Sequence, residues 1–176
     1  MTYERPGKIN LAALKDAGVS IAELLRYNIF VNEFQWNVLG REPKESQKCV
    51  TIIDMEGCGL SQAKGEVIEF IKAVSAYRGA HYPERCDHIF IINAPAWFSW
   101  LWKMLTPFID ARTRSRAHIV AAPGWYATGT EIFDELHKEM DPEQIPLDYG
   151  GKGAAMGQDP LELELLDHVA KLDCGC

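Results

Sequence analysis

Two acidic side chains and one thiol follow a short apolar run in the first third of the chain. Asp54, Glu56 and Cys58 lie at or just after the end of the run Cys49–Asp54, and the carboxyl end of a strand is where α/β proteins place much of their chemistry. Carboxylates can transfer protons, and a thiolate can attack an electrophile. However, no histidine lies nearby in the sequence to activate Cys58, and two acids alone define no reaction. An α/β enzyme that uses these three residues stays open as one alternative.

Three motifs of nucleotide-binding proteins and hydrolases fail on their spacing. Gly57-Cys58-Gly59 follows a predicted strand, but the third glycine of a G-x-G-x-x-G fingerprint would fall on Gln62. Gly151-Lys152-Gly153 has neither the spacing nor the following hydroxyl residue of a P-loop. The chain also has no G-x-S-x-G nucleophile elbow. These three classes of chemistry are therefore disfavoured.

Metal-ligating residue types are present without the spacing of a metal site. His81, Cys86 and His88 form no paired C-x-x-C or H-x-x-x-H motif. We therefore expect no metal and no cofactor. The ending Cys174-Gly175-Cys176 resembles a prenylation-type terminus, and its role stays open.

The composition describes a single acidic domain with enough apolar residues for a core. The chain has 176 residues, of which 47% are hydrophobic and 24% are charged, and its formal net charge is -7. An acidic surface disfavours nucleic acid as a partner. An odd number of cysteines, five, fits a reducing compartment, and no apolar stretch approaches the roughly 20 residues of a membrane span. We expect a cytoplasmic monomer that contacts membranes only peripherally.

Three β-branched apolar runs predict the centre of a parallel sheet, because they do not alternate between polar and apolar residues. Between the first two runs, apolar residues from Val67 to Val74 recur at helical spacing. This pattern predicts a right-handed βαβ unit. The three predicted strands are Cys49–Asp54, His88–Ala94 and Ala117–Ala122.

The remaining elements are predicted from caps and breakers. Ser20 is the expected N-cap of a helix over Ile21–Val38, and Thr2–Leu11 is expected to supply an edge strand and a turn. A further helix over Thr130–Glu139 is closed by the pair Asp141-Pro142. A glycine-rich segment then leads to a charged helical stretch that begins after Pro160.

The segment Trp97–Ile109 is apolar over most of the circumference of a helix. Its polar residues Ser99, Lys103 and Thr106 form a single narrow stripe. Such a helix must be buried on several sides, or must face a cavity on one side and an apolar environment on another. Three of the five tryptophans lie here, and tryptophan favours the membrane–water interface. An ordinary buried core helix is the alternative.

With these elements in place, the chain resembles the CRAL-TRIO lipid-binding domain, in particular that of phosphatidylinositol/phosphatidylcholine transfer proteins. The resemblance implies a mostly parallel, mixed sheet flanked by helices, with a large apolar pocket closed by a mobile gate helix. We expect this domain to span residues 1–151, with residues 152–176 as a helical tail or the start of a truncated region. The matching segments are HYPERCDHIFIINAPA (81–96), PFID (107–110), IPLDYGG (145–151), TIIDMEG (51–57) and, more weakly, GKINLAAL (7–14).

The resemblance also implies which residues line the pocket and form the gate. Residues 98–109 match the gate by position, with Trp102 and Leu105 at pocket-facing sites. Phe34 stands where the family has a tyrosine, and Cys49 stands where it has a serine. The expected pocket and gate residues are Phe98, Leu101, Trp102, Leu105, Phe108, Ile109 and Phe34.

A separate set of residues is implied for the lipid headgroup. Glu84 and Arg116 match a charged pair near the headgroup in phosphatidylinositol-binding relatives, and Thr113 matches a hydrogen-bond donor. Thr51 matches a hydroxyl contact of the choline-lipid mode. Arg116 also belongs to the basic cluster 112–116, which could bind an anion in this acidic chain. The family's helical N-terminal domain and a basic residue before the first strand have no counterpart in the sequence, so we expect a fragment.

The sequence therefore predicts a non-enzymatic domain that binds a hydrophobic ligand and transfers or presents it between membranes. We favour a phospholipid, phosphatidylinositol first, with transient membrane contact through the gate. A protein-interaction module of a larger protein, for example one that binds a small GTPase, is the main alternative.

Overall fold

The computed structural model describes residues 1–39, 48–60, 65–82, 85–119 and 131–173. The chain divides into two compact units, Met1–Ala122 and Pro123–Cys176. The first unit contains a four-stranded sheet, and the described residues of the second form two α-helices and a tight turn.

The sheet of the first unit is parallel, and its strands follow chain order, β1-β2-β3-β4. The two central strands are buried apolar runs, as expected for strands that are covered on both faces. The strands are β1 (Thr2–Glu4), β2 (Cys49–Asp54), β3 (Cys86–Ile92) and β4 (Ala117–Ile119).

The predicted strands are confirmed with small shifts of their ends. β3 begins two residues earlier than expected, where Cys86 pairs with Cys49. It ends at Ile92 because Asn93 adopts a left-handed conformation, with φ of 53°. The last residues of the third predicted strand, 120–122, lie outside the described residues.

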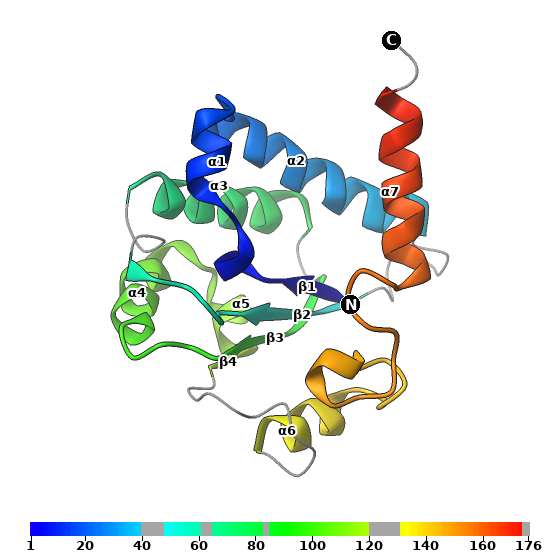
Figure 1. Ribbon diagram of the computed structural model, residues 1–176. Coiled ribbons are helices and arrows are strands. Elements are labelled where there is room, and N and C mark those ends of the chain that lie inside the picture. The colour runs from blue at the N-terminus through cyan, green and yellow to red at the C-terminus, as the bar shows by residue number, and fades with distance from the viewer. Residues whose placement is uncertain (40–47, 61–64, 83–84, 120–130, 174–176) are drawn as a thin grey trace. The chain divides into compact units, whose positions relative to one another are not determined.

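The helices of the first unit connect successive strands. Figure 1 shows α1, α2 and α3 on one side of the sheet. The capping box between Ser20 and Glu23 fixes the start of α2, as predicted for Ser20. The elements are η1 (Pro6–Lys8), α1 (Leu11–Asp16), α2 (Ile21–Phe34), a π-helical turn η2 (Gln35–Leu39), α3 (Glu66–His81), α4 (Phe98–Leu105), η4 (Thr106–Phe108) and α5 (Ala111–Ser115).

The two faces of the sheet differ in their covering. One face carries Thr51 and Ile53 of β2 together with Ile89 and Ile91 of β3, and helices α2, α3 and α4 pack on it. We call it the helical face. The opposite face carries Ile52, Phe90 and Ile92, which are fully buried.

The second unit contains α6 (Glu131–Glu139), η5 (Leu147–Tyr149) and α7 (Pro160–Asp173). The IPLDYGG segment forms its turn. Gly150 has a φ of 78°, and a Cβ added to Gly151 would lie 2.0 Å from the carbonyl oxygen of Ile145. Both glycines are therefore required by the backbone of this turn.

Candidate functional site

Helix α4 buries one side of its surface in an apolar cluster on the helical face. Phe98, Leu101 and Leu105 are buried there against Ile91 and Met55. Trp102 and Ile109 are partly buried against the same cluster, together with Ile68 and Ile71 of α3. Five of the predicted pocket and gate residues therefore meet over the carboxyl ends of the strands.

The other side of this segment is apolar and exposed. Trp100 is 56% exposed and Phe108 is 52% exposed, so Phe108 lies outside the buried cluster. The ammonium of Lys72 lies 4.5 Å from the centre of the Phe108 ring. Burial on one side and exposure on the other explain why the segment is apolar almost all round. No helix among the described residues is long and apolar enough to cross a membrane.

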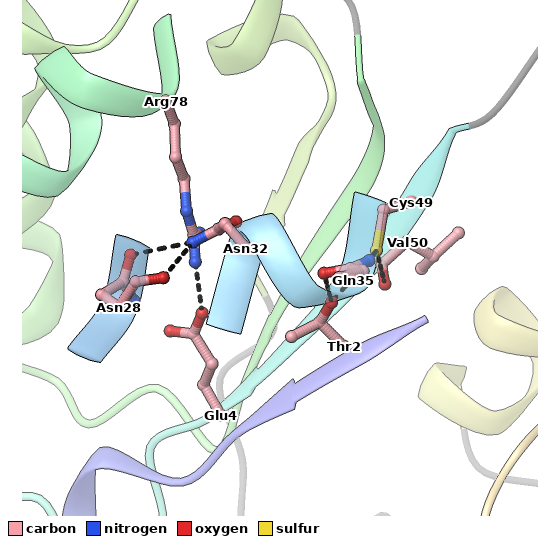
Figure 2. Close-up of polar contacts among 8 residues, drawn as sticks. All are labelled: Thr2, Glu4, Asn28, Asn32, Gln35, Cys49, Val50 and Arg78. Atoms are coloured by element: carbon pink, nitrogen blue, oxygen red, sulfur yellow. Dashed lines mark hydrogen bonds and ion pairs between the residues drawn. The ribbon is translucent and has the colours of Figure 1, made fainter. Parts of the chain in front are cut away.

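A second group of side chains on the helical face is polar. We call it the polar cluster (Figure 2). It draws on four separate parts of the chain, and Figure 2 shows its contacts in two groups, one around Cys49 and one around Asn32 and Arg78. Its members are Thr2, Glu4, Asn28, Asn32, Gln35, Cys49 and Arg78.

Hydrogen bonds join members of the polar cluster within each group. The Cys49 sulfur lies 3.1 Å from the hydroxyl of Thr2, and it accepts a hydrogen bond of 3.1 Å from the Gln35 amide. The side-chain amide of Asn32 donates to the backbone carbonyl of Asn28 at 2.7 Å. The bonds of Cys49 tie β1, η2 and β2 together near the amino ends of the strands, whereas the Asn32 bond lies within α2.

An ion pair completes the polar cluster. Arg78 of α3 donates to the Glu4 carboxylate at 3.1 Å. Both side chains are about one-third exposed. The pair therefore links α3 to Glu4, the last residue of β1, which lies level with Ile53 of β2.

Along β2, the helical face thus changes from polar to apolar. On β2, Cys49 and Thr51 come first, and Ile53 and then Met55 follow. Thr51 pairs with Thr2 on one side and Ile89 on the other, which places this predicted headgroup residue next to the polar cluster. Phe34 is buried on α2, with its ring 6.4 Å from that of Phe30.

Arg116 and Thr113 lie just before β4, at the same end of the sheet. Asp110 caps α5 by accepting a hydrogen bond from the Thr113 amide at 2.8 Å, and hydrogen bonds from Thr113 hold the pKa of Asp110 below its usual value. The Arg116 guanidinium donates to the carbonyl of Cys86. Its predicted partner Glu84 lies outside the described residues.

Burial raises the pKa of the Cys86 thiol, although the nearby charge of Arg116 acts in the opposite direction. Cys86 is the strand partner of Cys49. Arg116 is therefore hydrogen-bonded to β3 at Cys86, and Cys86 pairs with β2, the strand that carries Cys49 and Thr51.

Asp54, Glu56 and Cys58, the residues of the enzyme alternative, lie at the end of β2 and in the loop that follows it. The buried Asp54 carboxylate accepts hydrogen bonds from the Asn93 side chain at 2.8 Å and the Glu56 amide at 3.0 Å, and Arg5 lies 3.8 Å away. Burial and then the charge of Asp54 raise the pKa of Cys58 to about 11. Its thiolate is scarce near neutral pH. This arrangement favours a structural role for Asp54 and gives no support to a Cys58 nucleophile.

Sequence reasoning missed most of the polar cluster, although a signal exists. Val67, Ile71 and Val74 form the inward stripe of α3, and Arg78 continues that stripe at the next helical spacing. On α2, Asn28, Asn32 and Gln35 fall on one inward-facing stripe in the same way. A charge or a run of amides on an otherwise apolar stripe is the pattern that would have found them.

The comparisons with known proteins identify the family. A profile of the CRAL/TRIO domain matches residues 1–151. The chain belongs to the CRAL/TRIO domain family. A CRAL-TRIO domain-containing protein of Saccharomyces cerevisiae is 36% identical over 156 residues, which cover 85% of this chain and 46% of the relative.

Two further curated relatives carry names that describe lipid transfer or a cytosolic factor. A phosphatidylinositol/phosphatidylcholine transfer protein of Arabidopsis thaliana, SFH4, is 27% identical over 84% of this chain and 24% of its own length. The SEC14 cytosolic factor of Candida glabrata is 28% identical over 85% of this chain and 48% of its own length. The chain thus spans half or less of the length of these three relatives.

The crystal structure of Sfh5 shares the fold. The TM-score is 0.66 at 18% sequence identity, and the match covers 97% of this chain and 58% of Sfh5. The predicted arrangement of a parallel sheet flanked by helices is therefore confirmed for this CRAL/TRIO chain.

Proposed function

We propose that this chain binds a phospholipid on the helical face of its sheet and transfers or presents it between membranes without catalysing a reaction. The observation that carries the proposal is the change along β2, on the helical face, from polar at its start to apolar beneath α4. A molecule with a polar head and apolar tails matches this order. The names of its relatives as phosphatidylinositol/phosphatidylcholine transfer proteins support the same ligand class.

The proposed mechanism is partition between two apolar environments. Each acyl CH₂ group that leaves water gains about 0.8 kcal/mol, so two tails can be retained while the protein crosses the aqueous phase. Helix α4 covers the apolar end of the face with Phe98, Leu101 and Leu105, and its displacement would admit the tails. Its exposed Trp100 and the adjacent Phe108 would contact the bilayer at that moment.

We assign the headgroup to residues near the amino ends of the strands. Arg116, Thr113, Thr51 and Glu84 are proposed to contact it, with phosphatidylinositol as the favoured lipid. An arginine supplies a permanent charge and paired donors for a phosphate. We further propose that residues 1–151 form the lipid-binding domain, that residues 152–176 are an appended tail, and that the protein is a cytoplasmic monomer with peripheral membrane contact.

The first experiment asks whether the protein carries a lipid at all. Protein purified from cells is extracted with organic solvent, and the extract is analysed by mass spectrometry. A stoichiometric phospholipid is expected. A folded protein without any lipid, which also takes up none from vesicles, would contradict the proposal and favour the interaction module.

The second experiment tests the headgroup assignment. The variant Arg116→Ala should lower transfer of labelled phosphatidylinositol between vesicles and leave the circular dichroism spectrum unchanged. Arg112→Ala is the matched control, because Arg112 belongs to the same basic cluster but is exposed on α5. Equal transfer by wild type and Arg116→Ala would remove Arg116 from the headgroup role.

A further inference from the structure

Arg78 carries a donor that no described residue uses. The Nε atom of Arg78 is buried and has no hydrogen-bond partner among the described residues. A buried charged donor without a partner is costly, because the water it loses on folding is not replaced. Such a group is retained most readily where a ligand completes its hydrogen bonds.

The guanidinium of Arg78 has capacity beyond its ion pair with Glu4. Arginine has five N–H donors arranged as planar forks, and each fork matches two oxygens of a carboxylate or phosphate. Glu4 is held by one terminal nitrogen at 3.1 Å. The nitrogen that holds Glu4, Nη2, forms one fork with Nε, so an anion that bound both nitrogens would replace Glu4 there.

The polar cluster supplies no second charge of either sign. Its members other than Arg78 and Glu4 are neutral amides, a hydroxyl and a thiol. The Glu4 side chain is 37% exposed, so water can solvate its carboxylate when Arg78 turns to another anion. The resting ion pair therefore keeps the arginine in place without blocking it permanently.

Arg78 lies where the head of an amphiphile would lie. Helix α3 contributes Ile68 and Ile71 to the apolar cluster beneath α4, and its last turns contribute Arg78 to the polar cluster. Helix α3 thus changes from apolar in its first turns to polar in its last turns, and β2 changes from polar at its start to apolar at its end. A ligand with its tails under α4 would direct its head toward Arg78.

We infer that Arg78 binds the oxyanion of a lipid head, a carboxylate or a phosphate, and that Glu4 is the counter-ion it exchanges for this group. The inference rests on the proposed lipid-binding function. It adds a second anion-binding residue to the one proposed at Arg116, and the two lie toward opposite edges of the sheet, over β1 and before β4.

The test compares two ligands that share one tail and differ in head charge. Dissociation constants of oleate and oleyl alcohol are measured by calorimetry at roughly pH 8, where the carboxylate is ionised. Wild type should bind oleate at least about tenfold more tightly, the factor expected for one charge-assisted hydrogen bond. Arg78→Gln should abolish the preference and keep the binding of oleyl alcohol, whereas Arg26→Gln, at an exposed position of α2, should change neither.

A second variant separates ligand binding from a purely structural ion pair. Glu4→Gln removes the competing carboxylate, so oleate should bind more tightly than to wild type. Arg78→Gln and Glu4→Gln therefore have opposite effects if Arg78 binds the ligand. If both variants weaken oleate binding equally, Arg78 only holds the fold and the inference is wrong.

The remaining outcomes are also decisive. Phosphatidic acid and inorganic phosphate are titrated in parallel. If inorganic phosphate binds as tightly as the lipids do, and Arg78→Gln removes this binding, Arg78 belongs to a free-anion site and not to a lipid-head site. Equal binding of oleate and oleyl alcohol to wild type would overturn the inference and leave lipid binding intact. Binding of none of the lipids would overturn the proposed function and the inference together.

Discussion

Truncating Leu101 should loosen α4 selectively. The Leu101 side chain is 3% exposed and is enclosed by the apolar cluster of the helical face. Replacing a buried leucine by alanine costs about 2–5 kcal/mol. If α4 lifts to admit a ligand, the lifted state exposes this side chain in any case, so the substitution destabilises only the closed state. The opening equilibrium should then rise by about 30-fold or more.

Hydrogen exchange measured by mass spectrometry gives the readout. Amides of α4 in Leu101→Ala should exchange faster than in wild type, and the increase should exceed that of β3 amides in the same variant. Ile52→Ala is the control, because Ile52 is fully buried on the opposite face of the sheet. The reasoning fails if the two variants accelerate exchange in α4 and β3 by the same ratio, because α4 would then open only with the whole domain.

Two further predictions concern the second unit and the loop after β2. Gly151→Ala should lower the free energy of unfolding by about 2 kcal/mol or more, because the new Cβ would lie 2.0 Å from the Ile145 carbonyl oxygen. Gly79→Ala, in an open helical position, should instead raise the free energy of unfolding by about 0.5–1 kcal/mol. Urea denaturation measures both changes, and changes of the same sign would contradict the prediction. Because the pKa of Cys58 is raised to about 11 from 9.0, its thiolate fraction at roughly pH 8 should be about 100-fold lower than in the unfolded chain, and alkylation by iodoacetamide should accelerate only as the pH rises toward 11. Equal alkylation rates in folded and urea-unfolded protein near pH 8 would refute this assignment.

Local pattern was sufficient for three strands and for the start of α2, whereas the short helices α1 (Leu11–Asp16) and α5 (Ala111–Ser115) were not predicted. The apolar runs identified three strands because a strand buried on both faces has no polar alternation. Ser20 and Glu23 identified the start of α2 because a capping box is encoded within four residues. The end of β3 was misplaced by two residues because Asn93 turns away to bond Asp54, which lies 39 positions earlier.

Contacts between segments that lie far apart in the sequence were harder to predict. His88 was considered with His81 and Cys86, its neighbours in sequence, yet its ring nitrogen lies 3.1 Å from that of His118 on the next strand. Only the register of β3 against β4 brings these rings together. Arg78 and Glu4 were missed for the same reason, because an ion pair between residues 74 positions apart requires the sheet to be assembled first.

If α4 is displaced as proposed, the order of the strands limits how it can move. When four parallel strands follow chain order, right-handed crossovers all fall on one face of the sheet, and α4 lies within the crossover between β3 and β4. Both of its ends are therefore tethered to neighbouring strands. A displaced α4 stays at a high effective concentration beside its own site, so reclosure is an intramolecular step that needs no diffusional search. The opened state should consequently be short-lived unless a bilayer or a ligand tail occupies the surface that α4 has left.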